Sequence, residues 1–460
     1  MKLLLTATMV AALVPHPAAA QVETLTAPTF GRISVYAPSG APGAVVLFIS
    51  GDGGWNLGVV AMAERLRDLG ALVVGIDIRS FERGLAASGG GCSYPAGNLE
   101  ELSRHVQLHR KLPSYKRPIL VGYSSGATLV YAALASAPPE TFAGAISLGF
   151  CPDILIRPPL CEMRGLKTRN RHDNLGYDVQ PFAGSTVPWM VLQGEIDQVC
   201  NPAGTRAFVA ATGGAKVISL PKVGHGFGVP RNWEAQFLDA YRAVARAQPE
   251  PPRPTAPETA DLPLVEVPAA GGTARDDMAV IVTGDGGWAE IDKSIGAALA
   301  AEGVPAVGLS SLRYFWTPRT PDSAAADLAR IIRHYTDTWQ KRRVTLVGYS
   351  FGADVLPFLA TRLPPDALSR VSKVALLGLS PTASFEFHVA DWFGGGAATA
   401  YRTVPEVERL SVPVLCIKGS DEQDSACSSL SGRNISTVTI GEGHHFGGDY
   451  RRVAEAILRR

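Results

Sequence analysis

The sequence of 460 residues lacks a surplus of charge of either sign. Its 43 lysines and arginines face 42 aspartates and glutamates, so the formal net charge is +1. Binding nucleic acid requires a concentrated basic face, and nucleic acid is therefore not predicted as a partner. No C-x-x-C or H-E-x-x-H spacing occurs either, so we predict no metal site and no cofactor.

Long apolar runs are also missing. No stretch reaches about 18 uninterrupted apolar residues, so no membrane-spanning helix is predicted. The N-terminus instead has Lys2, a short apolar run from Leu3 to Val14, and the small residues Ala18-Ala19-Ala20 before Gln21. This pattern predicts a cleavable signal peptide over residues 1–20, and hence export from the cytoplasm.

Cysteine is scarce, with six residues in the chain. Export makes disulfides feasible. Cys416–Cys427 is the only pairing within the second half, and it is therefore the predicted disulfide there. The first half allows three connectivities, among which the sequence does not choose; its cysteines are Cys92, Cys151, Cys161 and Cys200.

What the sequence has in place of these features is repetition. Four pairs of related stretches occur in the same order in both halves: GDGGW ending at Trp55 and Trp288, GYSSGA from Gly122 and GYSFGA from Gly348, VPWMVLQGE from Val187 and VPVLCIKGS from Val412, and VGHGFG from Val223 and EGHHFG from Glu442. A repeat of roughly 230 residues is far too long for a solenoid unit, so we infer a duplicated domain.

The organisation follows from this repeat. We predict an N-terminal domain over residues 21–246, a Pro-rich linker over 247–263 and a C-terminal domain over 264–460. The proline density of AQPEPPRPTAPETADLP excludes helix and sheet interior, so the linker should be extended. Continuous apolar strands alternating with amphipathic helices predict, in each domain, a mostly parallel sheet with helices on both faces. The expected strands cover 44–49, 71–78, 118–121, 278–282, 304–309 and 344–347, and the expected helices of the second half cover 293–302 and 323–339.

Each half contains G-x-S-x-G where a predicted strand leads into a predicted helix. This context is typical of a nucleophile elbow, in which the glycines permit a tight turn and the serine hydroxyl stands at a helix N-terminus. There the helix dipole stabilises developing negative charge. The two candidate nucleophiles are Ser124 and Ser350.

A serine needs a base to take its proton, and the base needs an acid to orient it. In this architecture both follow the serine in loops after later strands. The first half offers Asp197 and His225 after such strands. The second half offers His444, with its acid open among Asp421, Glu422 and Asp424.

Two observations favour Asp424 as the second acid. DQVC, which begins at Asp197, matches DSAC, which begins at Asp424, and the separations from serine to acid are then 73 and 74 residues. Glu422 follows Gly419 by three residues, as Asp197 follows Gly194, so Glu422 is a serious rival. His445 is the less favoured base, because GHHF aligned with GHGF places it opposite Gly226.

The GDGGW turns close the strand expected beside each nucleophile strand. Such a turn donates one backbone N–H to the oxyanion, and the residue after the serine donates another. The predicted oxyanion holes therefore lie near Asp52 with Ser125 and near Asp285 with Phe351. A carboxylate there would repel negative charge, so each aspartate must point away, cap the turn, or neutralise a cation such as a substrate ammonium group. The ordered set of serine, acid and base, found twice, predicts two tandem α/β-hydrolase-like domains.

In combination, G-D-G-G-W, G-Y-S-[SF]-G-A and G-H-H-F-G in a tandem, signal-bearing chain resemble the AcvB/VirJ family of bacterial virulence proteins. The second half resembles the VirJ domain. The resemblance implies a periplasmic serine esterase that hydrolyses an aminoacyl-phospholipid at the membrane surface, with lysyl-phosphatidylglycerol as the substrate. It also implies secretion-system or virulence proteins as partners. The family nucleophile falls on Ser350, with His444 as base and Asp424 as acid, and the first half retains a second candidate triad.

Two alternatives stay open beside this interpretation. One is a serine esterase or peptidase with another substrate, and the other is a non-catalytic exported binding or chaperone-like protein on a hydrolase scaffold. Aromatic residues follow two strand ends of the second half, where ligands bind in open α/β sheets. They either cover acyl chains, touch a membrane or pack under a loop; they are Tyr314-Phe315-Trp316, Phe385, Phe387, Trp392 and Phe393.

Overall fold

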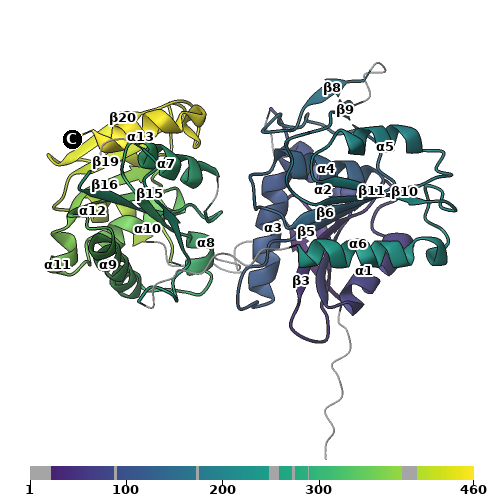
Figure 1. Cartoon of the computed structure of the whole chain (residues 1–460), viewed down its shortest axis with the longest axis horizontal. Coiled ribbons are helices and arrows are strands. Elements are labelled where there is room, and N and C mark those ends of the chain that lie inside the picture. Colours follow the sequence, from purple (N-terminus) through teal and green to yellow (C-terminus); the bar gives the residue numbers. More distant parts are fainter. Residues whose placement is uncertain are drawn as a thin grey trace, which may run out of the picture.

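The computed structural model describes residues 22–87, 91–171, 176–247, 258–271, 275–288, 290–385 and 401–459. The predicted signal peptide, most of the predicted linker, and Phe387, Trp392 and Phe393 lie outside these residues. Two domains follow one another along the chain (Figure 1). Within the described ranges, no helix combines the length and the apolar composition that crossing a bilayer requires.

The first domain is built on an eight-stranded sheet in the order β1-β2-β4-β3-β5-β6-β10-β11. The pairs β1–β2 and β2–β4 are antiparallel, and the remaining pairs are parallel. Its strands are β1 (Val22–Ala27), β2 (Gly31–Tyr36), β3 (Ala44–Ile49), β4 (Ala71–Ile76), β5 (Ile119–Tyr123), β6 (Gly144–Leu148), β10 (Trp189–Gly194) and β11 (Ala215–Leu220).

Strand β3 explains why helices cover both faces of this sheet. Its six residues, AVVLFI, are all buried, and alternate side chains enter two different cores. One core is closed by α1 (Leu57–Asp68) and α6 (Glu234–Arg246), and the other by α2 (Ile78–Ala87), α3 (Pro95–His109), α4 (Ser125–Ser136) and α5 (Pro202–Ala210). The domain also holds a small antiparallel sheet, β7 (Asp153–Ile154), β9 (Tyr177–Val179) and β8 (Thr168–Asn170), and the short helix η1 (Pro230–Asn232).

The second domain repeats the same order on seven strands, β12-β14-β13-β15-β16-β19-β20. The pair β12–β14 is antiparallel and the others are parallel. The strands are β12 (Leu264–Val267), β13 (Asp277–Val282), β14 (Ala306–Leu309), β15 (Arg343–Tyr349), β16 (Val371–Leu377), β19 (Val414–Lys418) and β20 (Ile435–Thr439). They correspond in order to the sheet from β2 to β11 of the first domain, so the predicted fold class is confirmed for both halves.

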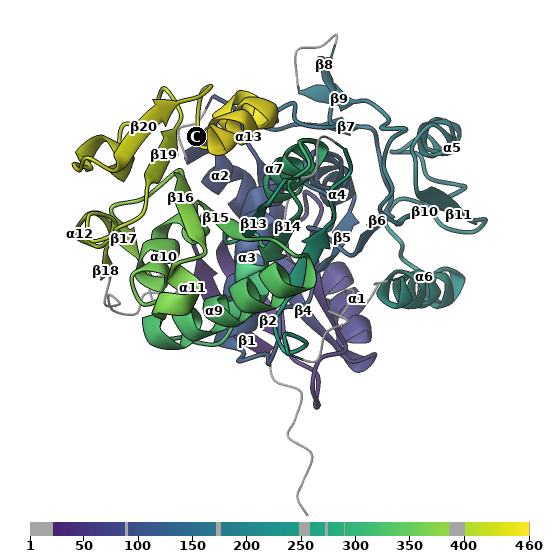
Figure 2. The ribbon, with the colours of Figure 1, turned by 60° about the vertical axis from the view of Figure 1, so that its left-hand side comes forward.

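Helices again cover both faces of the second sheet (Figure 2). One face carries α7 (Glu290–Ala301) and α13 (Tyr450–Leu458); the other carries α8 (Ser311–Tyr314), α9 (Pro321–Thr338), α10 (Phe351–Ala360), α11 (Pro365–Leu368) and α12 (Thr403–Val407). Helix α9 begins where Thr320 and Ser323 form a reciprocal capping box around Pro321. The remaining elements are β17 (Thr382–Ala383), β18 (Tyr401–Arg402), η2 (Ala426–Ser429) and η3 (Phe446–Gly448).

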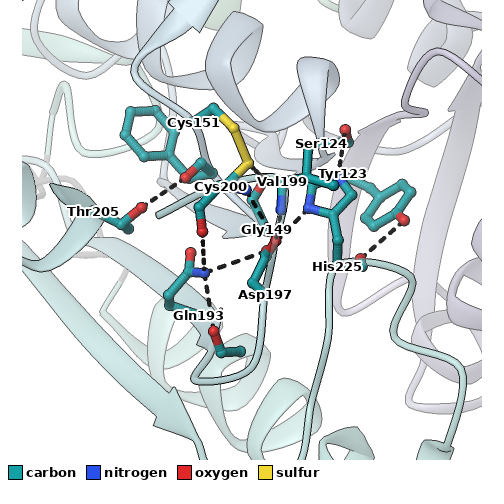
Figure 3. A network of polar contacts seen from close by, with 12 residues as sticks. Tyr123, Ser124, Gly149, Cys151, Gln193, Asp197, Val199, Cys200, Thr205 and His225 are labelled. Carbon is teal, nitrogen blue, oxygen red and sulfur yellow. Dashed lines mark hydrogen bonds and ion pairs between the residues drawn. A yellow bond between two sulfur atoms is a disulfide. The ribbon is translucent and has the colours of Figure 1, made fainter. Parts of the chain in front are cut away.

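Three disulfides connect the cysteines. The structure contains the predicted Cys416–Cys427 bond, and in the first domain it pairs Cys92 with Cys161 and Cys151 with Cys200. Only the second of these first-domain bonds reaches the loop that carries Asp197 (Figure 3).

Candidate active site

Both candidate nucleophiles occupy a strained turn between a strand and a helix. Ser124 has φ 57° and ψ −125°, and Ser350 has φ 51° and ψ −119°, values that cost a non-glycine residue of order 1–3 kcal/mol. The glycines of the first motif are required by close packing. A Cβ on Gly122 would come within 2.2 Å of the Gly126 carbonyl oxygen, and one on Gly126 within 2.3 Å of the Ser50 carbonyl oxygen.

The structure brings together the three residues of the first predicted triad (Figure 3). The Ser124 hydroxyl lies 2.9 Å from His225 Nε2, and His225 Nδ1 lies 2.9 Å from Asp197 Oδ2. Ser124 follows β5, Asp197 follows β10 and His225 follows β11, so parallel strands deliver all three to one edge of the sheet. The Asp197 side chain is fully buried and that of His225 is 16% exposed.

Asp197 is held as a carboxylate. Burial alone would raise its pKa, but hydrogen bonds from the Cys200 N–H, His225 and the Val199 N–H lower it below the usual value. The two backbone donors lie 2.9 and 2.8 Å from Oδ1. An ionised acid on Nδ1 fixes the tautomer that leaves Nε2 free to take the serine proton.

Residues that the motifs did not single out complete this support. The Tyr123 hydroxyl donates to the carbonyl of His225 at 3.0 Å. Gly149 has φ 61° and lies against the imidazole, where a Cβ would come within 3.2 Å of ring atoms. The second domain repeats both features with Tyr349 and Gly378. The sequence contained this signal, since each tyrosine directly precedes its serine and each glycine directly follows the next strand of the sheet.

In the second domain the structure pairs the base with Glu422, the rival acid, and not with Asp424, the favoured one. His444 Nδ1 lies 2.5 Å from Glu422 Oε1, whereas Asp424 is exposed and lines a separate surface hollow with Gln423 and Ser425. The distance from the end of the strand sets the position of the acid. Glu422 lies three residues after Gly419, just as Asp197 lies three residues after Gly194. The two extra residues therefore fall after the acid and not before it.

The second triad is less fully assembled than the first. Within the described residues no hydrogen bond joins Ser350 to His444, although the His444–Glu422 pair is formed. The His444 side chain is 40% exposed and that of Glu422 is 14% exposed. Catalytic hydrogen bonds are often loose before substrate binds, so this geometry does not disqualify Ser350 as a nucleophile. His445 is exposed and forms no hydrogen bond to Glu422.

The two glycine-rich turns lie beside the candidate nucleophiles: a Cβ on Gly51 would come within 2.9 Å of the Ser124 Cβ, and one on Gly284 within 3.7 Å of the Ser350 Cβ. Ser125 and Phe351 are the first residues of α4 and α10, so their N–H groups precede the helical hydrogen-bond ladder. The aspartates of the turns have different partners. Asp52 Oδ1 accepts the Ser125 hydroxyl at 2.6 Å, and Asp285 Oδ2 pairs with Arg104 Nη1 at 2.5 Å. The cation that pairs with Asp285 in the structure is thus a side chain of this protein.

One group of side chains has the proximity of a metal site. Ligand atoms of Asp197, Cys200 and His225 lie within 4.8 Å of one another. Cys200 is bonded to Cys151, however, and the carboxylate and imidazole are bonded to each other. A disulfide sulfur is no thiolate, so this donor set fits a catalytic triad better than a metal ion.

A mostly parallel sheet covered on both faces, with a strained serine after β5 or β15 and an acid and a histidine after later strands, defines each domain as an α/β-hydrolase fold. The chain belongs to the VirJ family of bacterial virulence proteins, whose model matches residues 43–146 and 276–460, more than half of the sequence.

Solved structures resemble about half of the chain. The esterase domain of a Rhodothermus marinus protein has 17% identity and a TM-score of 0.34, with 49% of this chain and 98% of that chain covered. Est1E from Butyrivibrio proteoclasticus has 13% identity and a TM-score of 0.33, with 49% and 98% covered. Dienelactone hydrolase from Anabaena variabilis has 18% identity and a TM-score of 0.34, with 50% and 96% covered. A comparison with curated proteins finds no match.

Proposed function

We propose that the chain is a serine ester hydrolase, and the observation that carries this proposal is the hydrogen-bonded series Ser124–His225–Asp197. The Ser124 oxygen attacks the ester carbonyl carbon while its proton passes to His225 Nε2. The carbonyl oxygen becomes an oxyanion held by backbone N–H groups near Asp52 and Ser125. The C–O bond to the alcohol then breaks, and the alcohol leaves with the proton from His225.

Water completes the cycle by the same steps in reverse. It attacks the acyl-serine carbonyl, gives one proton to His225, and releases the acid as the proton returns to Ser124. Asp197 stays ionised throughout and stabilises the imidazolium that forms twice. Ser350, His444 and Glu422 would perform the same steps in the second domain once Ser350 engages His444.

The substrate that we propose is an aminoacyl ester of phosphatidylglycerol, lysyl-phosphatidylglycerol, met at the periplasmic membrane surface after export through residues 1–20. The resemblance to the AcvB/VirJ family implies this substrate class, and the VirJ family model matches the chain. Apolar side chains beside the first triad also fit a lipid. Ile196 and Val199 flank Asp197 and are 60% and 67% exposed, and Val229 follows the His225 loop at 45% exposed.

The test is release of free lysine from vesicles of lysyl-phosphatidylglycerol by the mature full-length protein. We expect activity in the unmodified chain, and loss of it in the double variant Ser124→Ala/Ser350→Ala. Ser369→Ala, which replaces an exposed serine remote from both motifs, is the matched control and should keep full activity. Lysine release by the double variant would refute the serine mechanism.

A second candidate assigns catalysis to the first domain and binding to the second. The observation that favours it is the missing hydrogen bond between Ser350 and His444. A fluorophosphonate probe distinguishes the two cases, because it labels an activated serine and not a binding module. Labelling of Ser350 in the Ser124→Ala variant would exclude the binding role, and labelling of Ser124 alone would support it.

A further inference from the structure

Helix α3 lies on the side of the first domain that faces the second domain (Figure 1), and side-chain contacts connect the two there. Trp316 Nε1 donates to the carbonyl of Leu112 at 2.7 Å, and its ring lies 5.5 Å from that of Tyr115. Trp316 is only 6% exposed. The aromatic set from Tyr314 to Trp316, for which a lid over acyl chains was one expectation, is therefore packed within the protein, and Trp316 is part of the domain interface.

This contact brings a cation from the first domain to the second active site. Arg104 on α3 pairs with Asp285 at 2.5 Å, and its side chain is only 15% exposed while that of Asp285 is 53% exposed. Asp285 belongs to the glycine-rich turn after β13, the strand beside the nucleophile strand β15. The adjoining Gly284 is close enough that a Cβ there would lie 3.7 Å from the Cβ of Ser350.

The turn needs such a cation for an electrostatic reason. An ionised carboxylate beside an oxyanion hole opposes the negative charge that forms in the transition state. Burial would raise the pKa of Asp285, but the charge and hydrogen bond of Arg104 lower it, so Asp285 is ionised and its charge is matched by Arg104. The nearby carboxyl of Glu100 on α3 has its pKa raised by burial, an effect that the charge of Arg104 opposes and the charge of Asp285 reinforces.

In the first site the turn aspartate finds its hydrogen-bond partner within its own domain. Its turn aspartate, Asp52, accepts the hydroxyl of Ser125, the residue after the nucleophile. The equivalent residue in the second site is Phe351, which has no hydroxyl to donate. The two motifs thus differ in the residue after the nucleophile, and the turn aspartates differ in their partners. Where Ser125 is replaced by Phe351, Arg104 pairs with the aspartate.

We propose that Arg104 is a positioning residue for the second active site, which is complete only when the two domains are docked: it fixes the Asp285 turn and neutralises its charge beside the oxyanion hole. This inference rests on the proposed function, since it assumes that Ser350 reacts. It assigns the first domain a role in the chemistry of the second, in addition to its own triad.

The experiment measures the rate of fluorophosphonate labelling at Ser350 in the full-length Ser124→Ala chain. We expect Arg104→Ala to lower this rate about tenfold, less than the roughly 10²–10³-fold cost of losing an oxyanion donor. Arg104→Lys should restore most of the rate. Arg104→Ala/Asp285→Asn should also restore it, because a neutral amide no longer repels the oxyanion; a merely structural role for Arg104 predicts no such rescue.

Two controls keep the outcomes distinct. Arg110→Ala removes another arginine at the end of α3, one that pairs with Glu23 inside the first domain, and should leave Ser350 labelling unchanged. Labelling of Ser124 in a Ser350→Ala/Arg104→Ala chain reports whether the first domain still folds. An unchanged Ser350 rate in Arg104→Ala, or an equal fall at Ser124, would overturn the inference. Failure of both serines to react in the unmodified chain would refute the proposed function itself.

Discussion

The two domains share a strand order and a strained serine turn, yet their triads differ in how far they are assembled. In the first, two hydrogen bonds of 2.9 Å connect Ser124, His225 and Asp197. In the second, His444 is hydrogen-bonded to its acid Glu422 but not to Ser350. The His444 side chain is 40% exposed, against 16% for His225. Duplication preserved the scaffold, and the loops after the strands carry the differences that matter for chemistry.

The two GDGGW turns also differ in the charged side chains around them. Burial, together with the charges of Asp52 and Asp77, raises the pKa of Glu82 in the first domain to about 7, so several carboxyl groups gather near the first turn. The second turn is neutralised by Arg104. Identical sequences in two copies therefore create two different electrostatic sites, because their partners come from elsewhere in the chain.

Breaking the better-assembled triad should have the largest effect. In a Ser350→Ala chain we expect Asp197→Asn to lower the labelling rate of Ser124 about 10⁴-fold, because an amide on Nδ1 stabilises the wrong histidine tautomer. Asp239→Asn, at an exposed aspartate paired with Arg242, is the matched control and should leave the rate unchanged. A loss of less than tenfold at Asp197 would mean that the observed series is structural and not catalytic.

The identity of the second acid gives the next largest effect. In a Ser124→Ala chain, Glu422→Gln should lower Ser350 labelling by roughly 10²–10³-fold, less than in the first domain because the site begins less assembled. Asp424→Asn should change the rate by no more than about twofold, since Asp424 lies away from His444. The opposite ranking of these two variants would restore the DSAC alignment and contradict the His444–Glu422 geometry.

Removing a disulfide should have a smaller effect on the reactivity of the first site than replacing its acid. Cys151–Cys200 joins the acid loop of the first site to the segment after β6, and Cys200 also donates its N–H to Asp197. Replacing both cysteines by alanine should lower the free energy of unfolding by about 2–5 kcal/mol. It should also slow Ser124 labelling about tenfold, because the acid loop loosens, while Ser350 labelling stays unchanged.

The matched control for that variant is removal of Cys92–Cys161, a bond of similar loop length that does not touch the triad. It should destabilise the first domain in denaturant titrations yet leave the Ser124 labelling rate within about twofold. Equal slowing by both double variants would show that global stability, and not the acid loop, controls reactivity.

The sequence predicts the features that depend on residues close together along the chain. The strand predicted over 44–49 has the same bounds as β3. Six consecutive apolar residues between turn-forming residues favour a short buried strand. The strand expected over 71–78 ends at Ile76, since the Asp77 carboxylate accepts backbone N–H groups and helix α2 begins at Ile78. The elbows, the first triad residues and the Cys416–Cys427 pairing likewise follow from motifs and spacing.

The differences between prediction and structure have two sources, the choice between two alignments and contacts between the domains. Aligning DQVC with DSAC favours Asp424 on two shared residues, yet the end of the strand fixes where an acid can reach the histidine, and Glu422 lies there. The partner of Asp285 comes from a helix 181 residues earlier in the chain, across a domain interface. No pattern within either half contains that information, and the same holds for the burial of Trp316.

The smallest predicted effect concerns a buried carboxyl three residues after Phe351. Thr128 of the first domain donates its hydroxyl to the Cys151 carbonyl at 2.6 Å, whereas the corresponding Asp354 accepts the Ser380 N–H at 2.7 Å. Burial raises the pKa of Asp354 from 3.8 to about 7, and the Ser380 hydrogen bond opposes this only in part. The folded state therefore holds this proton more tightly than the unfolded chain does.

The sign of the pH dependence follows from that difference. The contribution of Asp354 to the free energy of unfolding is fully present below pH 3.8 and is lost as the pH rises through about 7. Asp354→Asn keeps an acceptor for Ser380 but carries no charge, so it should remove this loss and stabilise the second domain at pH 8 by about 1 kcal/mol. Denaturant titrations at pH 4 and pH 8 measure it, with Asp337→Asn as the exposed control, and parallel profiles for the variant and the unmodified chain would show that Asp354 is already ionised in the fold.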